Sequence, residues 1–299
     1  MKNIQLYNED NLEIMKRLPN ESIDVICIDP PYLYLKNQKL ERPFDEQLFF
    51  SECKRLLTKN GFIVMFGRGI SFYRWNAILD SLGFVFKEEI VWNKRLISSP
   101  VTPISRVHET ISLYSKPDGK INKVKLDFIE MNEFNPVKII ETINRIKTAF
   151  GNRDTFKRLN DYFTKNKKEL FQSIKGRNVT RSSNSCVQYN RTLQFVITLE
   201  EGEREKSIIE IPRDHYSTIH PTQKPVRLIE RLLSLVIPQD KERKDIVVAD
   251  WFGGSMSTME AVINMGMQGV STEIDEEYFE AGKQRIERLF ESKQEKLAL

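Results

Sequence analysis

Two hydrophobic periods alternate along the chain and predict its elements. Short apolar runs are typical of buried strands, and the stretches between them repeat an apolar residue every three or four positions, as amphipathic helices do. The N-terminal part shows strand patterns at Ile4–Tyr7, Ser22–Asp29, Phe62–Phe66, Phe84–Trp92 and Thr110–Tyr114. Helix patterns lie between them, around Leu12–Leu18, at Phe44–Leu57 and at Ser71–Leu82. Strands that alternate with helices imply a largely parallel sheet covered on both faces.

The same rhythm returns in the C-terminal part. Its elements are a helix at Pro225–Val236, a strand at Ile246–Asp250, a helix at Thr258–Met265, a strand that ends near Glu273 and a last helix capped by Asp275. Between the two parts, from about Lys116 to His215, the alternation is interrupted. There we expect helices at Val137–Phe150 and Asp154–Ile174, a polar loop at Lys175–Gln188 and a hairpin at Phe195–Ile211 that turns at Glu201-Gly202.

These patterns predict an α/β protein of two domains. Residues 1–115 and 216–299 would form a Rossmann-like, doubly wound, mostly parallel sheet with its helices. Residues 116–215 would form an inserted, largely helical domain.

Positive charge is concentrated in the insertion. The segment from Lys138 to Arg191 contains thirteen Lys and Arg against four Asp and Glu, a net charge of +9, whereas the whole chain carries only +4. A basic block within an acidic body is expected of a segment that binds nucleic acid, although a solvated helical face is the alternative. The candidates for contacts to DNA phosphates are Lys165, Lys167, Lys168, Lys175, Arg177 and Arg181.

Composition disfavours several classes of protein. No apolar run is long enough to cross a bilayer, and the N-terminal residues lack the apolar core of a signal peptide, so we expect a cytoplasmic protein without a membrane partner. The three cysteines, Cys27, Cys53 and Cys186, are odd in number and lack the spacing of metal ligands. Neither a disulfide scaffold nor a metal site is therefore expected.

The most informative stretch is Asp29-Pro30-Pro31-Tyr32, at the end of a predicted buried strand. Two consecutive prolines fix φ and lack N–H groups, so the carbonyls keep one direction. The Asp29 carboxylate and the Pro30 carbonyl can accept the two N–H bonds of an aromatic amine, while the Tyr32 ring can stack on its base. Such an arrangement favours attack by the amine on a methyl sulfonium. The string alone is also compatible with a polar turn.

A second candidate site follows the predicted strand Ile246–Asp250. The loop Trp251–Ser257 contains two glycines and precedes a helix, so backbone N–H groups and a helix N-terminus can approach a ligand. Glu273 ends the next strand, where a carboxylate can accept hydrogen bonds from ribose hydroxyls. A tight turn that needs glycine for packing is the alternative interpretation.

Together these motifs resemble those of circularly permuted, β-class amino-methyltransferases of DNA. Asp29-Pro30-Pro31-Tyr32 matches the catalytic D-P-P-Y of that family, and His220-Pro221-Thr222-Gln223-Lys224-Pro225 matches its H-P-T-Q-K-P segment. Asp250–Thr258 resembles its D-P-F-x-G-S-G-T-T loop. The resemblance covers nearly the whole chain outside Lys116–His215. It implies that the catalytic half precedes a target-recognition domain and that the cofactor-binding half follows it.

The resemblance implies a reaction, partners and a set of residues. The chain would transfer a methyl group from S-adenosylmethionine to the N6 amine of an adenine flipped out of double-stranded DNA, at a specific sequence. The resemblance favours a homodimer, and a cognate restriction endonuclease is a compatible partner. Catalysis would depend on Asp29, Pro30 and Tyr32. Cofactor contacts are expected from Asp10, Asp29, His220, Thr222, Gln223, Lys224, Asp250, Phe252, Gly254, Ser255 and Glu273.

Three positions depart from the family's motifs. Trp251 stands where the family usually has Pro, Met256 where it usually has the second Gly, and Glu9 where a Gly usually precedes Asp10. We expect the loop to be less permissive in φ and to carry a bulky side chain near the cofactor, which would weaken cofactor binding.

Two further segments, Trp92-Asn93-Lys94 and His108-Glu109, resemble positions that line the target base. A core Trp and a surface Lys or His are the alternative interpretation of these residues.

Other functions fit parts of the sequence. Methylation of cytosine at N4 uses the same chemistry, but cytosine-N4 members usually carry Ser where this chain has Asp29. A DNA-binding protein without catalysis is suggested by Trp251 and Met256, and a test of cofactor binding would distinguish it. A nicotinamide oxidoreductase is disfavoured because its G-x-G-x-x-G fingerprint is missing.

Overall fold

The chain divides into two compact units, which are described separately. In a computed structural model, residues 3–32, 42–95, 103–132, 141, 198, 200–214, 218–220 and 222–298 are described. One unit comprises residues 1–122 and 206–299, and the other comprises residues 123–205. Apart from Glu141, the helices expected at Val137–Phe150 and Asp154–Ile174 lie outside the described residues. The polar loop and the basic candidates Lys165, Lys167, Lys168, Lys175, Arg177 and Arg181 also lie outside them.

The larger unit is built on an eight-stranded sheet in the order β1-β10-β9-β2-β3-β5-β4-β8. All neighbouring strands are parallel except β5, which is antiparallel to both β3 and β4. The predicted mixed α/β fold with a mostly parallel central sheet is therefore confirmed. The strands are β1 (Ile4–Tyr7), β2 (Ile23–Ile28), β3 (Leu57–Gly67), β4 (Val85–Asn93), β5 (His108–Ser115), β8 (Ile208–Glu210), β9 (Val247–Asp250) and β10 (Gln268–Thr272).

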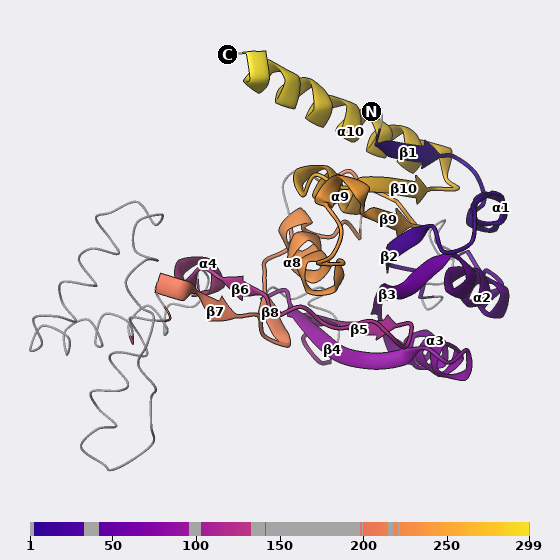
Figure 1. Ribbon diagram of the computed structural model, residues 1–299, viewed down its shortest axis with the longest axis horizontal. Coiled ribbons are helices and arrows are strands. Elements are labelled where there is room, and N and C mark those ends of the chain that lie inside the picture. Colours follow the sequence, from indigo (N-terminus) through magenta and orange to yellow (C-terminus); the bar gives the residue numbers. More distant parts are fainter. Residues whose placement is uncertain are drawn as a thin grey trace, which may run out of the picture. The chain divides into compact units, whose positions relative to one another are not determined.

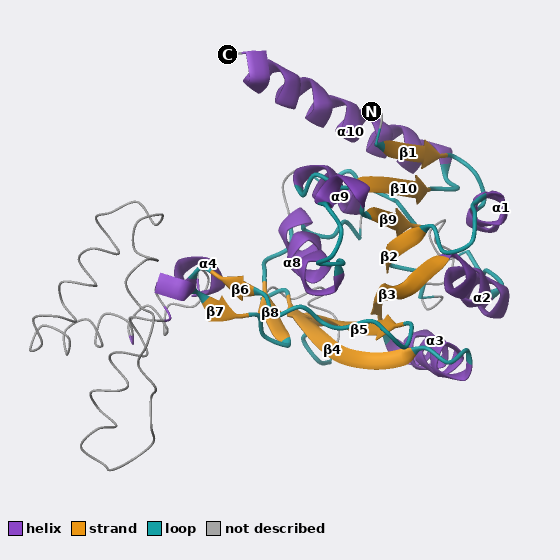
Figure 2. Cartoon of the chain, in the orientation of Figure 1, coloured by secondary structure: helices purple, strands orange, loops and turns teal. Residues whose placement is uncertain are grey.

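Helices cover both faces of this sheet (Figures 1 and 2). One face carries α1 (Asn11–Arg17), α2 (Glu46–Leu56) and α3 (Gly69–Ser81), and the opposite face carries α8 (Val226–Val236) and α9 (Ser257–Asn264). Because both faces are covered, every residue of β2 is buried, as expected of a central parallel strand. The long helix α10 (Glu276–Ala298) packs against α9, and η2 (Arg243–Asp245) precedes β9.

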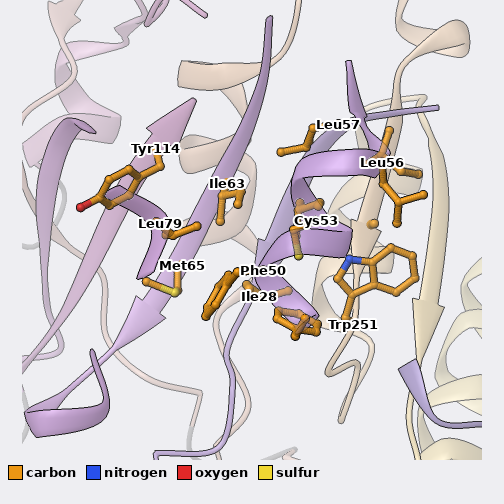
Figure 3. Packing of buried hydrophobic residues seen from close by; sticks show 14 of the residues in the cluster. Ile28, Phe50, Cys53, Leu56, Leu57, Ile63, Met65, Leu79, Tyr114 and Trp251 are labelled. Carbon is orange, nitrogen blue, oxygen red and sulfur yellow. The ribbon is translucent and has the colours of Figure 1, made fainter. Parts of the chain in front are cut away.

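The core on the α1–α3 face is dominated by large aromatic side chains. Phe49, Phe50 and Trp75 are fully buried there against Ile28 and Met65 of the sheet, and Figure 3 shows Phe50 beside these two strand residues. Each such side chain stabilises the fold by roughly 1.5–3 kcal/mol relative to an exposed one. This packing holds the ends of β2 and β3 in fixed positions.

The prediction of a hairpin at Phe195–Ile211 is wrong. Ile208–Glu210 forms β8, which pairs in parallel with β4 at the edge of the large sheet. In the smaller unit, β7 (Glu203–Arg204) pairs with β6 (Lys125–Leu126), close to the short helix α4 (Phe128–Asn132) in sequence. The turn signal at Gly202 has another cause, because Gly202 adopts a φ of 83° and its N–H bonds to the carbonyl of Thr198 at 2.9 Å, as after a helical turn.

Candidate functional site

A cavity of about 410 Å³ lies at the carboxyl ends of the parallel strands. Ligands of open α/β sheets bind in this place, because the loops that follow the strands converge there. Its walls are formed by the segments after β2, β9 and β10 and by the segment before α8. Every catalytic and cofactor candidate from the sequence lines it, namely Asp10, Asp29, Pro30, Tyr32, His220, Thr222, Gln223, Lys224, Asp250, Phe252, Gly254, Ser255 and Glu273.

Four charged side chains of alternating sign form a chain along one wall. The ammonium of Lys224 donates a hydrogen bond to Asp29 Oδ2 and lies 3.4 Å from Glu109 Oε2. The other oxygen of Glu109 accepts a hydrogen bond from Lys94 Nζ at 2.9 Å. Lys94 and Lys224 are only 2% and 7% exposed, and a buried charge without a partner is costly. The four charges therefore stabilise one another.

The electrostatics of this chain favour the ionised forms of Glu109 and Lys224. Burial works against ionisation of Glu109, but Lys224 and Lys94 hold its pKa at about 2. Burial also opposes a charged Lys224, yet Asp29 and Glu109 raise the pKa of this ammonium above its usual value. For Asp29, burial raises the pKa and Lys224 counteracts it. Lys224 is thus the cation that keeps the Asp29 carboxylate ionised.

Asp29 is further held by Tyr32. The Tyr32 hydroxyl donates a hydrogen bond to Asp29 Oδ1 at 2.5 Å, and the Tyr32 carbonyl accepts one from the Ser71 hydroxyl at 2.8 Å. The Tyr32 ring lies 6.2 Å from the ring of Trp75. These contacts fix the loop after β2 on the first turn of α3.

The segment before α8 presents a neutral histidine. Burial and the nearby Lys224 lower the pKa of His220 to about 4. The backbone N–H of Thr222 donates to His220 Nδ1 at 3.3 Å, which leaves the ring proton on Nε2. The ring packs edge-on against Tyr278 at 4.3 Å. The side chain of Gln223 is buried and accepts a hydrogen bond from the Ile219 N–H at 3.2 Å, so it shapes the segment.

The glycine loop after β9 is tied to Glu273 at the end of β10. Gly254 adopts a φ of 47° and its N–H donates to Glu273 Oε2 at 2.8 Å. Burial raises the pKa of Glu273. Burial also raises the pKa of Asp250, the last residue of β9, to about 7. The Ser255 hydroxyl is buried beside that of Ser257, at 2.9 Å.

Phe44 and Phe252 form an aromatic wall of the cavity, with ring centroids 5.3 Å apart. Asp10 lies on the same cavity and caps α1, because its carboxylate accepts a hydrogen bond from the Leu12 N–H at 2.9 Å. A flat aromatic ring of a ligand can pack on such a wall while a nearby carboxylate accepts its polar hydrogens.

The bulky loop residue Met256 does not crowd the cavity, contrary to expectation. Met256 is fully buried and lies outside the cavity lining, because its side chain fills the space left by two glycines. A Cβ added at Gly282 would lie 2.6 Å from Met256 Cγ, and one added at Gly253 would lie 2.8 Å from its sulfur. Met256 adopts a φ of 57°, at a cost of roughly 1–2 kcal/mol.

The indole of Trp251 is also taken up by the protein interior. It is 1% exposed and belongs to the core cluster, and Figure 3 shows it beside Cys53 and Leu56 of α2. The Trp251 carbonyl accepts hydrogen bonds from Asn11 and Thr272 at 3.2 and 2.9 Å. Trp251 also borders the cavity, and its buried indole N–H has no hydrogen-bond partner among the described residues. The Trp side chain therefore adds apolar packing beneath the loop but leaves one polar group unsatisfied.

Several cavity residues were not singled out from the sequence. Phe44 was assigned only to the start of a helix, and four arginines, Arg42, Arg68, Arg106 and Arg213, were not considered. Arg68 follows directly on β3, so the rule that ligands bind at the carboxyl ends of strands could have identified it. No comparable signal marks the other three arginines.

The described part of the chain offers neither a membrane span nor a metal site of clustered ligands. No helix there combines the length and apolar character needed to cross a bilayer. No three His, Cys, Asp or Glu side chains of the described residues are grouped so as to hold a metal ion.

Comparisons with known proteins agree with this geometry. A family model described as DNA methylase matches residues 23–284. The type II methyltransferase M.HinfI of Haemophilus influenzae is 31% identical over 156 residues, which span 43% of this chain and 42% of that enzyme. M.BglII of Bacillus subtilis, another type II methyltransferase, is 26% identical over 94% of this chain and 68% of its own length.

Two solved structures share the fold. The complex of M1.HpyAVI with SAM covers 94% of this chain and 99% of its own, at 20% identity and a TM-score of 0.54. The cytosine-N4-specific PvuII DNA methyltransferase covers 94% of this chain and 85% of its own, at 16% identity and a TM-score of 0.56.

Proposed function

The chain belongs to the DNA methylase family, whose members use S-adenosylmethionine, and from this premise we propose that it methylates the N6 amine of adenine in double-stranded DNA. One observation carries the proposal. Asp29, from the loop after β2, and Lys224, from the segment before α8, form an ion pair on the wall of the cavity in which Lys224 is buried and Asp29 is partly exposed. The D-P-P-Y and H-P-T-Q-K-P motifs thus meet at one point where a methyl donor and an amine can be brought together.

The residues of the cavity fit S-adenosylmethionine. Phe44 and Phe252 offer an aromatic wall for the adenine. Glu273 can accept the ribose hydroxyls with the lone pairs that the N–H groups of Gly254 and Asp275 leave free. A side chain at Gly254 would meet the His220 ring at 3.3 Å, so glycine keeps the backbone accessible. Asp29 supplies negative charge for a cationic ligand. When bound, the cofactor supplies an electrophilic methyl group.

On the substrate side, the chain's own groups would orient the amine. The Asp29 carboxylate and the Pro30 carbonyl accept its two N–H bonds, and the nitrogen lone pair is then directed at the methyl group. Tyr32 stacks on the base and holds Asp29 through its hydroxyl. Because the amine lies inside the duplex, the base must first leave the stack. Neither of the two described cysteines takes part, since Cys27 and Cys53 are buried and burial raises the pKa of each thiol.

Adenine is proposed over cytosine because of Asp29, where cytosine-N4 members of the family usually have Ser. A carboxylate is a stronger acceptor of an amine N–H than a hydroxyl. The similarity to the PvuII enzyme concerns the fold alone, so methylcytosine remains an outcome of the test below.

We further propose that the cofactor half follows the catalytic half in a permuted order, and that residues 116–215 recognise the target sequence. The first idea is supported by β9 and β10, which come late in the chain but lie between β1 and β2 in the sheet. The second is supported by the net charge of +9 between Lys138 and Arg191. A homodimer and a cognate nuclease stay predictions of the family resemblance.

The proposal is tested with Asp29→Ala. Methyl transfer from labelled S-adenosylmethionine to unmethylated genomic DNA should fall by about 100-fold or more, the loss typical of removing one preorganised polar group from a reaction site. Asp80→Ala, an exposed residue of α3, is the matched control and should keep the wild-type rate. An Asp29→Ala protein that methylates DNA at the wild-type rate would refute the assignment.

A further inference from the structure

Both oxygens of Asp29 accept a hydrogen bond within the protein. Oδ1 accepts from the Tyr32 hydroxyl and Oδ2 from the Lys224 ammonium. An incoming amine therefore competes for the carboxylate that is proposed to bind it. Because Lys224 is 7% exposed, its charge cannot be released to water without a large structural change.

A second acceptor for Lys224 lies next to Asp29. Glu109 Oε2 is 3.4 Å from Lys224 Nζ, and among the described residues this buried oxygen has no hydrogen-bond partner. A buried carboxylate oxygen without a donor is unusual, since leaving it unsatisfied costs about 1–3 kcal/mol. A small shift of Nζ would satisfy it and release Asp29 Oδ2.

Glu109 is held in place for this role. Its other oxygen accepts a hydrogen bond from Lys94 at 2.9 Å. Glu109 lies opposite Trp92 in the pairing of β5 with β4, and the Trp92 indole N–H is fixed to the Ile211 carbonyl at 2.7 Å. Glu109 is thus a fixed point, and Lys224, with its four-carbon side chain, is the mobile partner.

We propose that Lys224 passes from Asp29 to Glu109 when the amine of the target base binds Asp29, which makes Glu109 a positioning residue of the methyl transfer. This inference rests on the proposed function. No bond is made or broken in the step, which exchanges one ion pair for another at constant net charge. Glu109 touches neither reacting atom and acts only through Lys224.

The test replaces Glu109 by Gln, whose amide oxygen is a weaker acceptor for an ammonium. Lys224 should then stay on Asp29, and kcat/KM for unmethylated genomic DNA should fall about tenfold, the equivalent of one hydrogen bond to a charged group. Glu89→Gln, at an exposed position of neighbouring β4, is the control for charge and should behave as wild type. Affinity for S-adenosylmethionine should be unchanged in both variants.

A pH profile separates this role from a structural one. Glu109 raises the pKa of Asp29 by repulsion, so E109Q should move the acid limb of kcat/KM to lower pH although the plateau falls. If E109Q only disordered the site, the plateau of kcat/KM would fall but its acid limb would stay at the same pH. The other charged or titratable groups near the chain of charges are unaltered by the substitution: Tyr32, Cys27, His220, Asp250 and Arg213.

A double variant covers the case that E109Q does not fold because Lys94 loses its partner. Glu109→Gln with Lys94→Met removes one charge of each sign, and we expect it to fold, to bind S-adenosylmethionine and to remain slow. Wild-type kcat/KM in E109Q or in the double variant would overturn the proposed movement of Lys224 from Asp29 to Glu109. Absence of methyl transfer by the wild-type protein would instead contradict the proposed function.

Discussion

Lys224 donates a hydrogen bond to Asp29 although the two residues are 195 positions apart in the sequence. Asp29 leaves the carboxyl end of β2 and Lys224 precedes α8, so the pair joins the two parts of the chain that form the larger unit, before and after residues 123–205. A buried pair of this kind contributes little net stability, but removing one partner leaves an uncompensated charge. Each partner therefore controls the ionisation of the other.

Replacing Lys224 by Met should shift the pH dependence of methyl transfer upward. Burial raises the pKa of Asp29 and Lys224 counteracts it, so without Lys224 the carboxyl group should be protonated up to a higher pH and unable to accept the amine. The acid limb of kcat/KM should then move to higher pH by at least one unit, equivalent to about 1.4 kcal/mol. Lys224→Arg keeps the charge and serves as the control. An unmoved acid limb in K224M would mean that Lys224 does not set the charge of Asp29.

Restoring the family's glycine at position 256 should destabilise this protein. Met256→Gly relieves roughly 1–2 kcal/mol of left-handed strain but empties the space beside Gly253 and Gly282, and loss of a buried Met side chain costs about 2–5 kcal/mol. Because the free energy lost with the buried Met side chain exceeds the strain that is relieved, Tm should fall. Glu21→Gly is the matched control, because Glu21 has a φ of 53° and a half-exposed side chain. Its Tm should stay level or rise, and a rise in M256G as well would refute the packing argument.

Gly254→Ala should weaken binding of S-adenosylmethionine. The new Cβ would lie 3.3 Å from the His220 ring, at a φ of 47° that disfavours side chains, and the N–H bond to Glu273 would be disturbed. We expect at least a tenfold increase in Kd by calorimetric titration, or about 1.4 kcal/mol. Gly266→Ala is the control, since its φ is 73° and no atom lies within 4 Å of the added Cβ. Equal affinities of the two variants would show that strain at position 254 does not reach the cofactor site.

Stability of the cofactor-free protein should fall as pH rises through neutrality. Burial raises the pKa of Asp250 from 3.8 to about 7, so the folded state holds a proton that the unfolded chain has already lost. This contribution is complete below pH 3.8 and is lost as pH rises to 7. It amounts to on the order of 4 kcal/mol.

Urea unfolding of wild type and Asp250→Asn between pH 5 and 8 measures this contribution. The wild-type protein should lose stability relative to the variant over that interval, and Asp80→Asn should follow the wild type. Parallel curves for wild type and D250N would contradict a neutral Asp250 in the folded state.

Residues of the site that belong to a local sequence motif could be predicted, whereas contacts that depend on strand register or on distant packing could not. Asp29 and Glu273 could be identified because each follows the end of a strand, and parallel strands bring their carboxyl ends to one edge. Lys224 could be identified from the H-P-T-Q-K-P motif before α8. The Glu109 to Lys224 contact could not, because it needs the register of β5 between two strands of opposite direction. Met256 was misjudged because Gly282, which makes room for it, lies on α10 and has no local signal.

The β8 pairing illustrates the same limit within the fold. Ile208–Glu210 has an ordinary strand pattern, and its partner was sought locally, in a hairpin around Gly202. The actual partner is β4, more than a hundred residues earlier in sequence. Short edge strands leave this choice open, because their pattern specifies a buried face but no neighbour.

The most direct test of the central claim is identification of the methylated nucleoside. The wild-type protein is incubated with labelled S-adenosylmethionine and unmethylated genomic DNA, and the DNA is digested to nucleosides that are separated and counted. Label in N6-methyladenine, lost in Asp29→Ala, is the predicted result. Label in N4-methylcytosine would keep the site and overturn the proposed base, and no label from a protein that binds both S-adenosylmethionine and DNA would contradict the proposed activity itself.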